Sequence, residues 1–248
     1  MSALFSQEGR AALARLRGVP AIFGFDFDGT LAPIRPTPGE VAMEARTAGA
    51  FAALARRLPV AVVTGRGVAD VRARLAGTPR WVIGNHGAEG MPGADPARQA
   101  EQAAICAGWL AQLAGTDALT GAGILLEDKR YTLSLHYRLA PEPESARARL
   151  LAASAALHPL PAIVPGKCVL NLLPAGSWDK FRALRELADG APVFFAGDDE
   201  NDEIVFRQAP PGWVTVKVGS EGPSAARFRL KSQEAMADCL ELLLALCS

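Results

Sequence analysis

Short apolar runs alternate with segments of helical periodicity in the first part of the chain. The apolar runs are short and rich in β-branched or aromatic residues, which predicts buried strands at Ala21–Phe27, Val60–Val63 and Trp81–Ile83. The periodic segments predict helices at Glu44–Leu58 and Val68–Leu75. This β-α-β-α-β order is typical of a parallel sheet that is covered by helices.

The same alternation returns near the C-terminus. Trp178–Ala188 predicts a helix with Ser177 as its N-cap residue. Pro192–Ala196 and Val214–Val218 predict two further strands, and we expect the second of these to be the last strand of the chain. The apolar stretch Cys239–Cys247 is too short to span a bilayer, so we expect a buried C-terminal helix there.

The middle of the chain has a different order of elements. Two helices and three strands are predicted in the order α-β-β-α-β, at Gln99–Leu113, Ile124–Glu127, Tyr131–Tyr137, Glu142–Leu157 and Val169–Leu173. Such a run between two parts of an α/β pattern predicts an inserted second domain. We expect this domain at residues 98–175, and a core domain made of residues 1–97 and 176–248.

The composition of the chain limits the kinds of molecule that it is expected to bind. The chain has 248 residues, of which 50% are hydrophobic, and this is enough for a sizeable core. Its 26 basic and 26 acidic residues balance, so no electrostatic attraction to nucleic acid or to an anionic membrane is expected. The four cysteines form no C-x-x-C pair, and no N-terminal apolar run suits a signal peptide. We therefore expect a cytoplasmic monomer whose partner is a small molecule.

Two carboxylates stand directly after the first predicted strand, in the segment Asp26-Phe27-Asp28-Gly29-Thr30. The period-two spacing places Asp26 and Asp28 on one side of the chain. Two such groups can divide the work of phosphate transfer, because one can attack phosphorus while the other protonates the leaving oxygen and later activates water. Their crowding is costly unless a cation lies between them. An EF-hand is excluded, because that loop needs its glycine at the sixth position and Gly29 is at the fourth.

Three later motifs carry groups that suit phosphate and a cation. Thr64-Gly65-Arg66 follows a strand and can donate to a phosphate oxygen, although an N-cap role for Thr64 is the alternative. Lys180 lies in the first turn of a predicted helix and can neutralise a phosphate, although a solvated surface lysine is the alternative. After Gly197, the six residues Asp198–Glu203 include five acids, which suit Mg²⁺ or, alternatively, an exposed helix start.

Taken in order, these motifs resemble those of the haloacid dehalogenase superfamily of phosphatases, across nearly the whole chain. The resemblance implies an α/β fold with a Rossmann-like parallel-sheet core, an aspartyl-phosphate intermediate and Mg²⁺ as cofactor. It implies that Asp26 is the nucleophile and a metal ligand, and that Asp28 is the general acid/base and offers its main-chain carbonyl to the metal. The remaining residues that it implies are Thr64, Gly65, Arg66 and Lys180 around the phosphate, and Asp198 and Asp202 at the metal.

A narrower resemblance is to the trehalose-6-phosphate phosphatases. The matching pieces are Phe25–Ile34, Thr64–Arg66, Gly84–Glu89, Glu127–Lys129, His136–Arg138, Gly166–Lys167 and Gly197–Asp199. By this resemblance the inserted domain is an α+β cap that reads the sugar, with Lys129, His136 and Lys167 near the substrate. For His136, a satisfied histidine on a strand is the alternative.

The chain departs from that family at three positions. Asn171 stands where the family has a glutamate that helps bind sugar hydroxyls, and we expect this asparagine to face the substrate. Asn201 replaces a threonine in the acidic motif, and Phe181 replaces the glycine after the motif lysine. The groups that perform the chemistry are unchanged, whereas the substitution at Asn171 leaves the choice of sugar open.

We therefore expect an enzyme that hydrolyses trehalose 6-phosphate to trehalose and phosphate, a step of trehalose biosynthesis. A phosphatase for another sugar phosphate, such as sucrose phosphate or a glycosyl-phosphoglycerate, is the alternative within the same class. A non-catalytic sugar-phosphate sensor is the alternative outside it. Binding alone needs no acid/base, so the presence of Asp28 together with Asp26, Lys180 and Asp198 argues against a sensor.

Overall fold

The computed structural model describes residues 1–35, 37–220 and 222–247. The chain forms two compact units: unit 1 comprises Met1–Met91 and Asp179–Ser248, and unit 2 comprises Pro92–Trp178. The strands are β1 (Ser2–Ala3), β2 (Ile22–Phe25), β3 (Val60–Val63), β4 (Trp81–Ile83), β5 (Leu125–Asp128), β6 (Leu133–His136), β7 (Ala162–Gly166), β8 (Val169–Leu173), β9 (Val193–Gly197), β10 (Val214–Val218) and β11 (Phe228–Leu230). The α-helices are α1 (Gln7–Ala14), α2 (Ala45–Arg57), α3 (Val68–Arg74), α4 (Pro96–Ala114), α5 (Pro143–Ala155), α6 (Lys180–Ala188), α7 (Glu203–Gln208) and α8 (Met236–Cys247).

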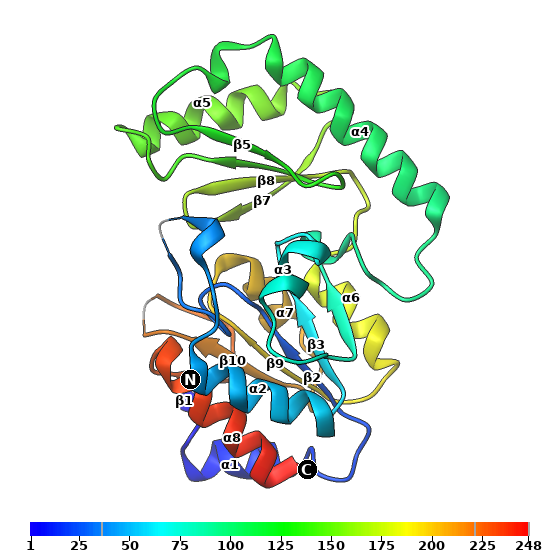
Figure 1. The fold of residues 1–248 in the computed structure, drawn as a ribbon, viewed down its shortest axis with the longest axis vertical. Coiled ribbons are helices and arrows are strands. Elements are labelled where there is room, and N and C mark those ends of the chain that lie inside the picture. Colours follow the sequence, from blue (N-terminus) through cyan, green and yellow to red (C-terminus); the bar gives the residue numbers. More distant parts are fainter. Residues whose placement is uncertain (36, 221, 248) are drawn as a thin grey trace. The chain divides into compact units, whose positions relative to one another are not determined.

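Unit 1 is built on a seven-stranded parallel sheet in the order β1-β11-β10-β9-β2-β3-β4. From β2 the chain proceeds outward through β3 and β4, and from β9 it proceeds in the other direction through β10 and β11 (Figure 1). The order therefore reverses between β2 and β9, which pair with Phe25 opposite Ala196. Ligands of open α/β sheets bind beyond the carboxyl ends of the strands at such a switch point. The topology thus indicates the loops after β2 and β9 as the place where a ligand binds.

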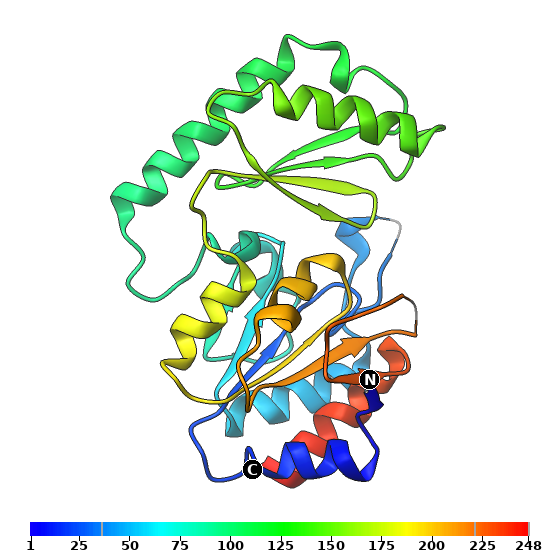
Figure 2. The same cartoon turned by 180° about the vertical axis from the view of Figure 1, so that it is seen from behind.

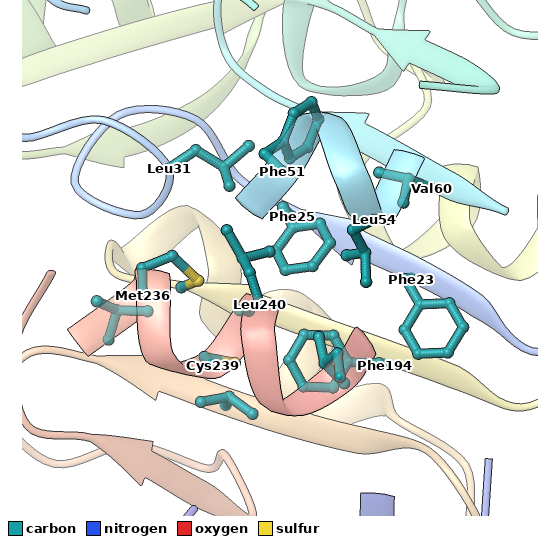
Figure 3. Close-up of a cluster of buried hydrophobic side chains, with 14 of the residues drawn as sticks. Phe23, Phe25, Leu31, Phe51, Leu54, Val60, Phe194, Met236, Cys239 and Leu240 are labelled. Carbon is teal, nitrogen blue, oxygen red and sulfur yellow. The ribbon is translucent and has the colours of Figure 1, made fainter. Parts of the chain in front are cut away.

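An apolar core packs between this sheet and the helices α1, α2 and α8. The ring of Phe25 in β2 meets that of Phe51 in α2 edge-on, with centroids 6.3 Å apart, and lies 5.5 Å from that of Phe194 in β9. Leu54 of α2 and Leu240 of α8 are fully buried in the same cluster (Figure 3). The two strands that flank the switch point are therefore fixed by the best-packed part of the molecule.

Helices α6 and α7 cover the opposite face of the sheet, which Figure 2 shows from behind. A Cβ atom on Gly24 of β2 would lie 2.8 Å from Cδ2 of Leu184, so α6 approaches the strand closely. Leu184 comes one helical turn after Lys180, the first residue of α6. The close packing of α6 against Gly24 therefore places Lys180 near the carboxyl end of β2.

Unit 2 is an antiparallel sheet in the order β5-β6-β8-β7, with α4 and α5 packed on one face. The side chains that meet these helices are apolar and buried, and they include Leu133, Leu135, Leu170, Leu172 and, from α4, Trp109. Because successive strand residues point to opposite faces, Ser134, His136 and Asn171 lie on the other face of the sheet. Unit 2 thus has one apolar face under its helices and one polar face.

The fold class expected from the sequence is confirmed, with a parallel-sheet α/β core and an α+β segment inserted into it. The bounds of four strands agree with the sequence pattern, at Val60–Val63, Trp81–Ile83, Val169–Leu173 and Val214–Val218. These strands are short, apolar and bounded by glycine or proline, which makes them the clearest signals in the chain.

Several expectations about single elements were wrong. Ser177 is not the N-cap of α6, because Asp179 takes that place and accepts the N–H of Arg182. Val214–Val218 is not the last strand, since β11 follows it and pairs with the two-residue strand β1. Strand β7 was not predicted, because Pro165 interrupts its apolar pattern, and its place at the edge of the sheet explains why proline is tolerated.

The longest helix of the described residues is α4, with 19 residues. In those residues no helix is both long enough and apolar enough to cross a bilayer. The C-terminal apolar stretch belongs to α8, whose buried side chains, Leu240 and Leu243 among them, pack in the core of unit 1.

We predict that Phe51→Ala lowers the free energy of unfolding of unit 1 by about 3–5 kcal/mol, because it leaves a cavity beside Phe25. The matched control is Val19→Ala, since Val19 is 42% exposed, and its effect should stay within about 0.5 kcal/mol. Both variants are compared with the wild type by urea denaturation followed by circular dichroism. Equal midpoints for Phe51→Ala and the wild type would contradict this account of the core.

Candidate active site

Two loops at the switch point bring three carboxylates together. Asp26 directly follows β2 and Asp198 directly follows β9, and the N–H of Asp26 donates to the carbonyl of Ala196 at 2.9 Å. Asp202 lies in the turn after Asp198. One oxygen from each of Asp26, Asp198 and Asp202 lies within 4.8 Å of the other two. These three side chains, called the acidic cluster below, are all buried.

The ammonium group of Lys180 lies inside the acidic cluster. Its Nζ is 2.9 Å from an Asp26 oxygen and 2.7 Å from an Asp202 oxygen, and the side chain is 3% exposed. The N-cap residue Asp179 fixes the helix end from which Lys180 projects. One ammonium group thus contacts two of the three carboxylates, and the acidic cluster keeps an excess of negative charge.

Burial and charge perturb both central groups. Burial raises the pKa of Asp26 well above its usual range; Lys180 opposes this, but the carboxylates of Asp202, Asp198 and Asp28 add to it. Burial alone would lower the pKa of Lys180, but Asp202 and Asp26 outweigh it and hold that pKa above its ordinary value. The lysine therefore stays charged, but its single positive charge does not balance the negative charge of the carboxylates. A divalent cation would supply the missing charge.

Gly29 and Gly197 leave the space that the acidic cluster occupies. A Cβ atom on Gly29 would lie 2.2 Å from Oδ2 of Asp198, and the residue has a φ of +74°, which suits glycine. A Cβ atom on Gly197 would lie 2.2 Å from Cγ of Asp202. The glycines of both motifs are therefore needed for the close packing of the carboxylates.

Arg66 holds Asp28 in a bidentate ion pair. Nε and Nη2 of Arg66 donate to the two oxygens of Asp28, each at 2.7 Å, and Nη1 donates to Asp70 at 2.7 Å. Burial alone would lower the pKa of this guanidinium, but Asp28 and Asp70 raise it above its ordinary value. The structure thus places Arg66 beside Asp28, with its donors directed at two carboxylates.

Thr64 and Gly65 directly follow β3 and precede Arg66 of this ion pair. Oγ1 of Thr64 accepts the N–H of Arg66 at 3.2 Å, and the side chain is buried. Helix α3 has Gly67 as its N-cap, so the alternative of an N-cap role for Thr64 is excluded. A Cβ atom on Gly65 would lie 2.5 Å from Cε1 of His86, so this glycine makes room for the imidazole ring.

The loop after β4 holds the segment that follows β3 by hydrogen bonds, although the sequence analysis gave this loop no role. Asn85 and His86 have φ values of 50° and 58°, which residues other than glycine rarely adopt. Oε2 of Glu89 accepts the Asn85 side-chain N–H at 2.9 Å and the Val68 backbone N–H at 2.8 Å. The signal that could have found this role is the segment Gly84–Glu89, which was matched as a motif only.

In unit 2, Glu127 links two of the residues expected near a sugar. Its Oε2 lies 2.8 Å from Nε2 of His136 and 3.5 Å from Nζ of Lys129. Burial raises the pKa of Glu127, but His136 and Lys129 outweigh it and hold that pKa below its ordinary value. Glu127 was not among the expected site residues, although it begins the matched segment Glu127–Lys129.

Asn171 is tied into the sheet of unit 2. Its Oδ1 accepts the hydroxyl of Ser134 at 2.7 Å, and its Nδ2 donates to the carbonyl of Val164 at 3.1 Å. The residue is 3% exposed, and these bonds join three adjacent strands. Lys167, by contrast, is an exposed residue in the turn between β7 and β8. The structure thus makes Asn171 a cross-link of the polar face.

The parallel α/β core, with D-x-D-G-T after its first long strand, a buried lysine and a second acidic loop, agrees with the resemblance to the haloacid dehalogenase superfamily of phosphatases. Within it the chain belongs to the trehalose-phosphatase family, whose model matches residues 24–234.

Relatives and solved structures agree with this assignment. The trehalose-phosphate phosphatase of Mycobacterium avium (strain 104) is 35% identical over 243 residues, which cover 90% of this chain and 62% of the relative. The chain thus spans less than two thirds of that protein. The crystal structure of a trehalose-6-phosphate phosphatase related protein has a TM-score of 0.75 at 23% identity, covering 91% of this chain and 97% of the other. The C-terminal domain of the C. albicans trehalose-6-phosphate phosphatase has a TM-score of 0.72 at 19% identity, covering 98% of both chains. At these identities the two structures show the shared fold.

We predict that a divalent cation displaces protons when it binds the acidic cluster. The raised pKa of Asp26 means that this carboxyl keeps its proton to a higher pH than a free aspartate does. A cation competes with that proton, so its affinity should fall as the pH is lowered from neutrality. Calorimetric titration with Mg²⁺, in two buffers of different ionisation enthalpy, measures the protons released. Binding that is independent of pH and of buffer would contradict the prediction.

Proposed function

We propose that this protein hydrolyses trehalose 6-phosphate to trehalose and phosphate. The observation that carries the proposal is the buried carboxylate of Asp26 at the switch point, with Lys180 against it and Asp28 two residues further along. Family membership supports phosphate-ester chemistry on a trehalose phosphate. A non-catalytic sensor would need neither a nucleophile nor an acid/base, whereas Asp26 and Asp28 offer one carboxylate for each of these roles.

Asp26 is the proposed nucleophile. One of its oxygens forms a bond to phosphorus as the bond from phosphorus to the sugar oxygen breaks, which leaves an aspartyl-phosphate. Asp28 gives a proton to the departing sugar oxygen and then takes one from the water that hydrolyses the aspartyl-phosphate. Arg66 donates one hydrogen bond to each oxygen of Asp28 in the structure, which leaves each oxygen a second lone pair for the proton that Asp28 transfers.

The donor set of the acidic cluster fits Mg²⁺, a hard cation that prefers carboxylate oxygens together with those of phosphate and water. Asp26, Asp198 and Asp202 would hold it, with the main-chain carbonyl of Asp28. When bound, Mg²⁺ supplies positive charge that offsets the repulsion between carboxylates and a phosphate dianion. Lys180 adds an ammonium group 2.9 Å from an oxygen of Asp26.

Thr64, Gly65 and Arg66 are proposed to bind the phosphate with Lys180. The hydroxyl of Thr64 can donate to a phosphate oxygen while its own oxygen continues to accept the N–H of Arg66. Gly65 has no side chain that would collide with the ring of His86, so the backbone after Thr64 can pack closely beside it.

Unit 2 is proposed to be the cap that recognises the disaccharide. The core motifs handle only the phosphate, so specificity for the sugar must come from groups elsewhere. Glu127, Lys129 and His136 offer an acceptor and donors in one hydrogen-bonded group, and the exposed Lys167 adds a cation. The side-chain amide of Asn171 is engaged in hydrogen bonds within the sheet. We therefore propose that Asn171 affects sugar recognition indirectly, by holding the hydroxyl of Ser134 in place.

We further propose that the protein works in the cytoplasm. All four cysteines are free: Cys106, Cys168, Cys239 and Cys247. Burial raises the pKa of Cys106 to about 12, with a further contribution from Asp128, so this thiol is unreactive. Free thiols in a chain of this length suit a reducing compartment.

The test is a phosphate-release assay with Mg²⁺ on trehalose 6-phosphate, sucrose 6-phosphate, glucose 6-phosphate and an aryl phosphate. We expect the highest kcat/KM on trehalose 6-phosphate. We predict that Asp26→Asn lowers kcat by roughly a thousandfold or more, because an amide is a poor nucleophile. Asp189→Asn is the matched control, since Asp189 ends α6, is exposed and has a φ of 45° that asparagine adopts readily.

Two results would count against the proposal. A much higher kcat/KM on another sugar phosphate would remove trehalose 6-phosphate as the substrate. Substantial turnover by Asp26→Asn, in protein shown to be folded, would remove Asp26 as the nucleophile.

We predict that Glu127→Gln raises KM for trehalose 6-phosphate and lowers kcat/KM by about tenfold or more, while activity on the aryl phosphate stays unchanged. Hydrogen bonds to a carboxylate are worth about 1.5–3 kcal/mol, and the amide also weakens the hold on His136 and Lys129. Glu101→Gln is the control, because Glu101 is exposed on α4 of the same unit. Equal losses on both substrates would argue that Glu127 does not read the sugar.

A further inference from the structure

Lys217 is a buried lysine that the chemistry above does not use. It lies on β10 opposite Gly197 of β9, and it is 9% exposed. Its Nζ donates to the main-chain carbonyl of Asp198 at 2.6 Å. In the described part of the chain no carboxylate lies within ion-pair distance of this ammonium group.

A buried ammonium group without a counter-ion is costly, and an apolar residue would fill this strand position more cheaply. The neighbours of Lys217 in β10, Val216 and Val218, are apolar and buried. The charge at Lys217 therefore needs an explanation outside the packing of the sheet, and its one hydrogen bond leads to the acidic loop.

The peptide unit between Asp198 and Asp199 is held at both ends. Lys217 binds its carbonyl oxygen, and Asp202 Oδ2 accepts its N–H at 3.0 Å. A trans peptide is planar, with its C=O and N–H pointing in opposite directions. Fixing the carbonyl therefore also aims the N–H at Asp202, and it sets the Cα from which the Asp198 carboxylate projects.

We propose that Lys217 is a positioning residue that holds this peptide so that Asp198 and Asp202 present their carboxylates to a divalent cation. The inference rests on the proposed function for the role of the cation. Hydrogen-bond partners behind metal ligands affect metal affinity by roughly 10–100-fold. A second consequence separates this role from a simple charge effect. Loss of a positive charge beside a cation site would tighten cation binding, whereas loss of the anchor would weaken it.

The experiment measures Mg²⁺ binding directly, by calorimetric titration of the full chain without phosphate. Lys217→Met removes both the donor and the charge at similar length, and we expect Mg²⁺ to bind roughly 10–100-fold more weakly. At saturating Mg²⁺, KM for trehalose 6-phosphate should stay near the wild-type value. The matched control is Lys231→Met, because Lys231 is an exposed lysine of the same unit, and it should bind Mg²⁺ like the wild type.

Lys217→Arg keeps the charge but moves the donors to a longer, planar group, so weaker Mg²⁺ binding is expected here too. This variant decides the question if Lys217→Met does not fold. Unchanged or tighter Mg²⁺ binding in a folded variant would overturn the inference, and so would a wild type that binds no Mg²⁺. If the wild type binds Mg²⁺ but does not hydrolyse trehalose 6-phosphate, the proposed substrate fails while the role of Lys217 is still decided by the titration.

Discussion

The mutual repulsion of three buried carboxylates is the constraint on which the rest of unit 1 depends. Asp26, Asp198 and Asp202 lie within 4.8 Å of one another and out of water, where like charges are most costly. Lys180 offsets part of that cost and cannot offset all of it. Lys180 forms ion pairs with Asp26 and Asp202, and the negative charge that remains favours a partner that brings positive charge.

Such a site persists only because the structure beneath it is strongly packed. The strands that carry Asp26 and Asp198 are adjacent, and their aromatic residues lie at the centre of the core with α2 and α8. Repulsion at the strand ends therefore acts on the least deformable part of the sheet. Functional sites commonly hold strain of this kind, and removal of one carboxylate often stabilises the protein while it abolishes the chemistry.

The sequence predicted the groups of this site better than their connections. Apolar runs that end in Asp26, Thr64 and Asp198 could be recognised because parallel strands place their carboxyl ends at one edge of the sheet. The Asp28–Arg66 ion pair, the hydrogen bond from Lys217 to Asp198 and the link between Glu127 and His136 could not be predicted, because each depends on how strands pair and how side chains are oriented across them. Strands β1, β7 and β11 were missed for a local reason: they are short or interrupted by proline, so pairing with neighbours decides their conformation more than intrinsic preference does.

The interleaving of the two units along the chain has a consequence for biosynthesis. Unit 2 is one continuous segment, whereas the sheet of unit 1 joins β2 to β9 across most of the polypeptide; the contact between Thr30 and Asp198, for example, spans 168 positions. On the ribosome unit 2 is therefore complete while β2 still lacks its neighbour on one side. The nascent chain presents an open, apolar strand edge until β9 emerges, and such an unpaired edge favours aggregation during this period.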